Sequence, residues 1–149
     1  MDPATFPQVS LFEDKFQHGP RSNMVFVKVN FCSFCEHHFV PMDGTACIAY
    51  IPNGKLIGFS KIPRIVRFFA RRPQVQERLT AQIADAMGTL TGSNDIAVSL
   101  CAQHHCMIAR GIESDNSHAI TNALRGEFEA NASLRKEFFD ALDREVLKK

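Results

Sequence analysis

The sequence lacks the features that would place the chain in a membrane or export it from the cell. No apolar run approaches the roughly 20 residues that a membrane-spanning helix needs, so we expect no membrane partner. Residues 1–4 do not form a basic stretch leading into an apolar one, which argues against a secretory signal and favours a cytoplasmic protein. Internal repeats and low-complexity stretches are also absent, and 149 residues are typical of one domain.

Neither sign of charge dominates, and the number of cysteines is odd. The chain has 17 Lys and Arg against 16 Asp and Glu, which gives a net charge of +1. This balance argues against a nucleic-acid partner, because proteins that bind nucleic acids are usually strongly basic. Five cysteines in a chain without a secretory signal argue against a disulfide framework and favour reduced, metal-binding or catalytic thiols.

The hydrophobic pattern predicts a loose N-terminal arm, residues 1–23, followed by one domain of strands and helices. The predicted strands cover residues 9–12 (within the arm), 24–31, 45–51, 96–100 and 118–124, with extended structure over 104–110. The predicted helices run from Ser60 to Pro73, over 75–90 and over 133–146. This order predicts an α+β fold with helices on one face of an antiparallel sheet.

Cysteine and histidine are concentrated in two short segments that lie far apart in the sequence. Residues 35–38 read Cys-Glu-His-His and residues 104–106 read His-His-Cys, and together they hold six of the chain's eleven cysteines and histidines. If the first segment forms a helical turn, its first and fourth side chains point to the same side. If the second is extended, its first and third side chains share one face and His105 takes the other. The two segments therefore predict a shared metal site.

The simplest such site has Cys35, His38 and Cys106 as ligands and leaves His37 and His104 nearby but unbound. Two thiolates and an imidazole favour zinc. Three protein ligands leave a fourth position for water, which is the arrangement of catalytic zinc sites. Free imidazoles beside such a site can carry protons, because their ordinary pKa of about 6.5 suits both uptake and release.

A second interpretation of the thiols uses Cys32 and Cys35, which form a C-x-x-C pair. Together with Cys106 and a histidine, this pair would make a closed, structural zinc site. Alternatively, the two thiols would act as a redox pair. The spacing leaves both alternatives open beside the catalytic site.

Basic residues are concentrated between positions 61 and 78, where the only acid is Glu77. The basic residues are Lys61, Arg64, Arg67, Arg71, Arg72 and Arg78. Such a run is either the solvated face of a helix or a binding site for a polyanion such as a triphosphate.

Four motifs, taken in order, resemble the GTP cyclohydrolase I family. They are Cys35-Glu36-His37-His38, Ile57-Gly58-Phe59-Ser60-Lys61-Ile62-Pro63-Arg64, Arg72-Pro73-Gln74-Val75-Gln76-Glu77-Arg78 and His104-His105-Cys106-Met107-Ile108-Ala109-Arg110-Gly111. The resemblance extends from about Val25 to Phe139, so residues 24–149 are expected to form a catalytic domain. It implies a zinc enzyme that hydrolytically opens the guanine imidazole ring of GTP and gives 7,8-dihydroneopterin triphosphate and formate.

The resemblance also implies a role for each matching residue. The positions that match the zinc ligands are Cys35, His38 and Cys106, in agreement with the argument from side-chain faces. His37 and His104 match the histidines assigned to proton transfer. Gln76 and Glu77 match the pair that holds the guanine edge, where a carboxylate accepts hydrogen bonds from N1–H and the 2-amino group. The positions that match residues around the ribose and triphosphate are Ser60, Lys61, Arg64 and Arg110.

The fold implied by the resemblance is the tunnelling fold, an antiparallel sheet backed by two helices. Its subunits join sheet to sheet into a β-barrel with active sites between subunits, so we expect a homo-oligomer that binds GTP. Family members usually carry several more helices before the catalytic domain, and this sequence resembles a short form without them. A pentameric ring and a decamer both remain open.

Two other functions compete with the zinc-dependent cyclohydrolase. One is a non-catalytic relative that binds nucleotide or another subunit, against which the retained His37, His104 and Glu77 argue. The other is a different pterin or deazapurine enzyme of the same fold. Those groups use a three-histidine zinc site or a cysteine nucleophile without zinc, and neither pattern matches this sequence.

Overall fold

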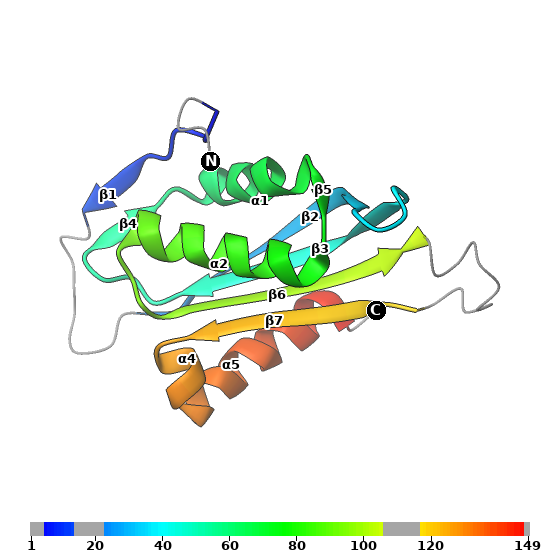
Figure 1. Cartoon of the computed structure of the whole chain (residues 1–149). Coiled ribbons are helices and arrows are strands. Elements are labelled where there is room, and N and C mark those ends of the chain that lie inside the picture. The colour runs from blue at the N-terminus through cyan, green and yellow to red at the C-terminus, as the bar shows by residue number, and fades with distance from the viewer. Residues whose placement is uncertain (1–4, 14–22, 106–116, 148–149) are drawn as a thin grey trace.

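The computed structural model describes residues 5–13, 23–105 and 117–147 (Figure 1). The strands in this part of the chain are β1 (Leu11–Glu13), β2 (Val25–Cys35), β3 (Pro41–Tyr50), β4 (Lys55–Ile57), β5 (Pro73–Gln74), β6 (Ile96–His104) and β7 (Ala119–Arg125). The helices are α1 (Ile62–Ala70), α2 (Gln76–Thr91), α4 (Glu127–Ala130) and α5 (Ala132–Leu142), with the 3-10 turn η1 (Phe59–Lys61) before α1 and the π-helical turn η2 (Asp143–Leu147) after α5. The α+β class predicted from the sequence is confirmed.

The main sheet has the order β5-β2-β3-β6-β7. Four of its strands pair antiparallel, as predicted, but β5 pairs parallel with the end of β2. The sheet is therefore mixed, and the prediction of a purely antiparallel sheet is wrong at this edge. Because β5 is only two residues long, it has no hydrophobic period that a sequence pattern could reveal. A separate two-stranded sheet pairs β1 with β4.

Helices α1 and α2 cover one face of the main sheet (Figure 1). Their apolar stripes are buried against alternate residues of β2, β3 and β6, and the residues that form this layer include Val29, Phe31, Ile48, Ile65, Phe69, Leu79, Ile83 and Met87. Burying an aliphatic or aromatic side chain of this kind stabilises the fold by roughly 1.5–3 kcal/mol. Gly92, in a left-handed conformation with φ of 69°, ends α2. The pair of helices backing the sheet is as predicted.

The last helix, α5, lies on the opposite face of the sheet (Figure 1). Its Phe138 and Leu142 are buried with Cys47, Ala49 and Ala97, which belong to the alternate residues of β3 and β6. The prediction that all helices lie on one face is therefore wrong for α5. An amphipathic pattern shows that a helix has an apolar stripe, but it does not show which face of a sheet that stripe covers.

Part of the N-terminal arm packs against the helix layer. The ring of Phe6 lies edge-on against Phe68, with 5.0 Å between ring centroids, so this part of the arm contacts α1. None of the helices that the structure describes is long and apolar enough to cross a membrane.

Candidate active site

The segment Cys35–His38 forms a tight turn at the end of β2. The Phe39 N–H donates to the Cys35 carbonyl at 2.8 Å, which closes a single helical turn, and the Cys35 N–H donates to the Val40 carbonyl at 2.9 Å. Phe39 has a positive φ of 51°, which lets the chain reverse into β3. One helical turn is the conformation in which the side chains of Cys35 and His38 point to the same side.

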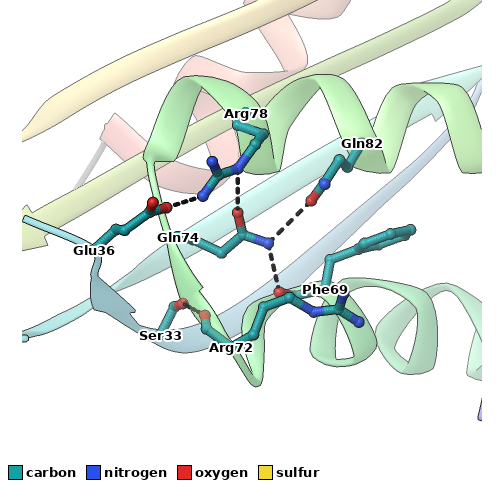
Figure 2. Close-up of polar contacts among 7 residues, drawn as sticks. All are labelled: Ser33, Glu36, Phe69, Arg72, Gln74, Arg78 and Gln82. Carbon is teal, nitrogen blue, oxygen red and sulfur yellow. Dashed lines mark hydrogen bonds and ion pairs between the residues drawn. The ribbon is translucent and has the colours of Figure 1, made fainter. Parts of the chain in front are cut away.

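The turn is held against the helices by a polar network (Figure 2). Glu36 forms an ion pair with Arg78, and the Arg78 Nε donates to Gln74 Oε1 at 3.2 Å. The Gln74 amide nitrogen donates in turn to the Phe69 carbonyl at 2.9 Å and to Gln82 Oε1 at 3.0 Å. Because Gln74 is only 1% exposed, this network joins the turn rigidly to the end of α1 and the beginning of α2.

The backbone ties the same turn to β5. The Glu36 N–H donates to the Gln74 carbonyl at 3.0 Å, and the Ser33 hydroxyl donates to the Arg72 carbonyl at 3.2 Å. The sequence interpretation missed Glu36, Gln74 and Arg78 as positioning residues. Gln74 lies in β5, before α2 begins, so the four-residue spacing of a helix does not predict its contact with Arg78.

The C-x-x-C alternative does not fit this geometry. Strand β2 continues through Cys35, and residues three apart in a strand point to opposite faces of the sheet. Cys32 is accordingly exposed while Cys35 is buried. A metal or disulfide that joins Cys32 to Cys35 would require β2 to end earlier, so the structure favours the site built from Cys35 and His38.

The donor atoms of the turn are uncommitted within the described part of the chain. The side chains of Cys35, His37 and His38 make no hydrogen bond or ion pair with any described residue, and the rings of the two histidines lie 6.3 Å apart. A free thiol and a free imidazole on one turn suit a zinc ion. The described residues contain no cluster of three or more metal-ligating side chains, and the predicted third ligand, Cys106, lies outside them, as does Arg110.

His104, the last residue of β6, lies on the same end of the sheet as the turn. The strand register aligns Ser33, Met42 and His104 across β2, β3 and β6, which spans roughly 10 Å at the usual strand spacing. Burial lowers the pKa of His104, and the Glu77 carboxylate partly offsets this effect. The imidazole is therefore neutral near pH 7 and available to accept a proton.

The side chains of His104 and His105 point to opposite sides, as predicted, but the prediction of extended structure is wrong at His105, because β6 ends at His104 and His105 is helical. His104 Nε2 lies 2.6 Å from Gln76 Oε1 on the side of the sheet that carries α2. His105 Nε2 instead lies 2.6 Å from Asp43 Oδ1, and both of these side chains are exposed. His105 thus points away from the predicted site.

Gln76 and Glu77 begin α2 and point in different directions. Gln76 is buried, at 3% exposure, and its amide contacts His104 and the strands below. Glu77 is exposed in the first turn of the helix, where the helix dipole and the free backbone N–H groups stabilise a carboxylate. We call the turn at residues 35–38 together with Gln76, Glu77 and His104 the metal end of the chain.

Ser60, Lys61 and Arg64 lie at the other end of the helix layer, and we call these three residues the cationic end. They flank the beginning of α1, whereas the turn at residues 35–38 contacts the segment that follows the end of α1 (Figure 1). The nine residues of α1, at about 1.5 Å each, separate the two ends by roughly 13 Å. Among the described residues, the cationic end therefore lies about one length of α1 away from Cys35 and His38.

The chain is similar to one known protein family over almost its whole length. The family model described as GTP cyclohydrolase I matches residues 3–143. The chain is 50% identical over 145 residues to GTP cyclohydrolase 1 of Aeromonas hydrophila, a match that covers 97% of this chain and 65% of that protein. It is 50% identical over 143 residues to GTP cyclohydrolase 1 of Vibrio cholerae, covering 95% of this chain and 64% of that protein.

The chain thus spans just under two thirds of the length of these relatives. A solved structure with a similar fold is the apo form of the archaeosine synthase QueF-Like, with a TM-score of 0.59 and 14% sequence identity. That match covers 69% of this chain and 93% of the other, and it supports the fold alone. Because the family model matches almost the whole sequence, the chain belongs to the GTP cyclohydrolase I family.

Proposed function

We propose that the chain is the catalytic domain of a GTP cyclohydrolase I. In this reaction water opens the guanine imidazole ring of GTP, formate leaves, and 7,8-dihydroneopterin triphosphate forms. The observation that carries the proposal is the metal end itself. Strands β2 and β6 and the start of α2 hold four kinds of side chain there. They are the free thiol and imidazole of the turn, the neutral half-buried imidazole of His104, and the exposed carboxylate of Glu77.

The proposed metal ligands are Cys35, His38 and Cys106. A zinc ion bound there would supply Lewis-acid activation of water at neutral pH. The backbone bond from Glu36 to Gln74 holds the turn that carries the first two ligands, and the ion pair of Glu36 with Arg78 adds to it; metal ligands need this kind of support from their surroundings.

The side chains of the metal end account for the proton transfers and for recognition of the base. His104 is neutral near pH 7 and can accept a proton from attacking water, and His37 is exposed beside the proposed ligands, where it can donate to a ring nitrogen. The Glu77 carboxylate is matched to guanine, because N1–H and the 2-amino group are two adjacent donors.

We propose that the triphosphate is bound by Ser60, Lys61, Arg64 and Arg110, and that the first three come from a second copy of the chain. The side chains of Lys61 and Arg64 form no ion pair with described residues, so their charges are available to an anion. We place the two ends of one site on different copies because the cationic end and the turn at residues 35–38 lie at opposite ends of α1.

A homo-oligomer also explains the edges of the sheet. Strand β7 pairs only with β6 among the described strands, and β2 pairs with β5 over two residues only, so most of each outer edge is open. Open edges can pair with a neighbouring copy. Edge-to-edge pairing of this kind generates the barrel of a pentameric ring or of a decamer.

The direct test is to incubate zinc-loaded protein with GTP and to measure formate together with a fluorescent pterin after oxidation. We expect both products in equal amounts. Binding of GTP without release of formate under metal-replete conditions would contradict the proposal and would favour a nucleotide-binding relative without activity.

A further inference from the structure

We infer that Gln76 is a positioning residue that fixes the tautomer of His104, so that Nε2 carries the hydrogen and Nδ1 keeps its lone pair. This inference rests on the proposed function for its catalytic meaning. Its structural part depends only on the hydrogen bonds around the Gln76 amide.

The orientation of the Gln76 amide is fixed by the backbone below it. The amide nitrogen lies 2.9 Å from the Ala119 carbonyl oxygen and 3.2 Å from the Leu100 carbonyl oxygen. Carbonyl oxygens only accept hydrogen bonds, so the NH₂ group must face them. The opposite orientation would place Oε1 against two other oxygens in a buried environment, with no hydrogen between them.

Two threonine hydroxyls give the same orientation independently. The Thr80 hydroxyl donates its single hydrogen to the backbone carbonyl oxygen of Gln76 at 2.8 Å. In the 2.7 Å contact between Thr80 and Thr121, the donor must therefore be Thr121. The Thr121 oxygen is then free to accept from the Gln76 amide nitrogen, which lies 3.1 Å away. Every donor in this ring of contacts has an acceptor.

The remaining atom of the amide, Oε1, faces His104 Nε2 at 2.6 Å. An amide oxygen only accepts, so Nε2 must donate. A neutral imidazole has one N–H, which leaves Nδ1 without a hydrogen. The contact with Gln76 thus holds the ring in one orientation, with the Nδ1 lone pair directed away from Gln76.

This assignment differs from the role that resemblance implies for Gln76. Both hydrogens of its amide are committed to the strands, and the side chain is 3% exposed. It offers no donor to a purine. Recognition of the guanine edge at this helix then falls to the neighbouring Glu77, which is exposed.

The tautomer can be measured directly by solid-state NMR of zinc-loaded protein labelled with ¹⁵N-histidine, with His104 assigned by its loss in His104→Gln. At about pH 8, where imidazoles are neutral, we expect a single Nε2–H tautomer of His104 with a hydrogen-bonded Nε2–H. An Nδ1–H tautomer, or a mixture of the two, in the wild-type protein overturns the inference. This wild-type measurement needs no variant of Gln76 to fold.

Two variants separate positioning from a structural role. Gln76→Met keeps the size of the side chain but removes the acceptor, and we expect it to lose the hydrogen-bonded Nε2–H signal. Thr121→Val removes a contact on the other side of the amide, while the two carbonyl acceptors still fix its orientation. We therefore expect the wild-type tautomer in this matched control. Loss of the tautomer in Thr121→Val, or its retention in Gln76→Met, overturns the inference.

Kinetics distinguish the inference from a guanine contact. We expect Gln76→Met to lower kcat for formate release by at least about 10-fold while KM for GTP stays within about two-fold. A rise in KM at constant kcat would assign Gln76 to the base instead. If the wild-type protein released no formate, the proposed function would fail, yet the NMR measurement would still decide the tautomer separately.

Discussion

The metal end and the cationic end of the chain differ in how far their side chains are organised before any ligand arrives. At the metal end, Gln74 and Gln76 are buried and hydrogen-bonded, and they fix the turn at residues 35–38 and His104. At the cationic end, Ser60 and Arg64 are exposed, and Lys61 is half-buried, without an ion pair to any described residue. The side chains of the first end are therefore held in place by the protein, whereas the positive charges of the second are not neutralised by any residue that the structure describes.

This difference suggests a division of labour between two copies of the chain. Chemistry requires geometry that is fixed to within fractions of an ångström, and a single folded copy can supply it. Binding of a triphosphate requires mainly positive charge, which tolerates longer side chains and a position across an interface. Changes at the metal end should have effects that decrease from a metal ligand to the base contact to the supporting ion pair, and a mixture of variants then tests both ends together.

Replacing Cys35 with serine removes a proposed metal ligand, and we expect loss of bound zinc and of formate release. Ligands to zinc at such sites must be deprotonated, and a serine hydroxyl is a poor substitute for a thiolate. The matched control is Cys32→Ser, because Cys32 lies on the opposite face of β2 and should leave zinc unchanged. Metal content measured by elemental analysis checks both variants, and loss of zinc in Cys32→Ser would restore the C-x-x-C interpretation.

Replacing Glu77 with glutamine tests base recognition at the metal end. The amide keeps the shape of the carboxylate but loses its charge and one acceptor, so we expect GTP to bind roughly 10- to 100-fold more weakly. Zinc content should remain unchanged, because Glu77 is not among the proposed ligands. Calorimetry with GTP measures the affinity, and an unchanged dissociation constant would remove Glu77 from the guanine contact.

Replacing Arg78 with alanine should have the smallest effect of the series. Its ion pair with Glu36 joins side chains that are 47% and 45% exposed, and such pairs contribute at most about 1 kcal/mol. We therefore expect zinc to bind only a few-fold more weakly, since the turn keeps its backbone bonds to Gln74. Arg67→Ala is the control, because Arg67 is exposed and forms no ion pair with described residues. Complete loss of zinc in Arg78→Ala would show that the network, rather than the backbone, holds the ligands.

Much of this organisation could be predicted from the sequence. The alternation of apolar and polar residues predicts strands β2 and β6, and the apolar stripes predict helices α1 and α2. These patterns are visible because burial of one face imposes a two-residue period on a strand and a 3.6-residue period on a helix. The opposite directions of His104 and His105 were predicted, although His105 is helical and lies just after the end of β6. The two-residue period of a strand, applied to residues 32 and 35, explains why the C-x-x-C pair does not converge in the structure.

Other features depend on contacts that no local pattern encodes. The parallel pairing of β5 involves two residues, and the placement of α5 on the far face depends on how the chain leaves β7. Gln76 was assigned to substrate because it stands beside Glu77 in a binding motif. Its position on the stripe of α2, three residues before Leu79 and seven before Ile83, was a signal that it points into the core.

The most direct test of the account mixes a variant of each end. His104→Gln damages the metal end, and a Lys61→Ala, Arg64→Ala double variant damages the cationic end, so each protein alone should release little formate. If the two ends of one site come from different copies, co-expressed subunits form some sites with both ends intact. We predict recovery to about a quarter of wild-type activity for random assembly.

A mixture of His104→Gln with Glu77→Gln is the control, because both changes damage the metal end and every site then carries a defect. It should show no recovery. Activity of the first mixture that does not exceed the average of its two components would contradict an active site shared between copies.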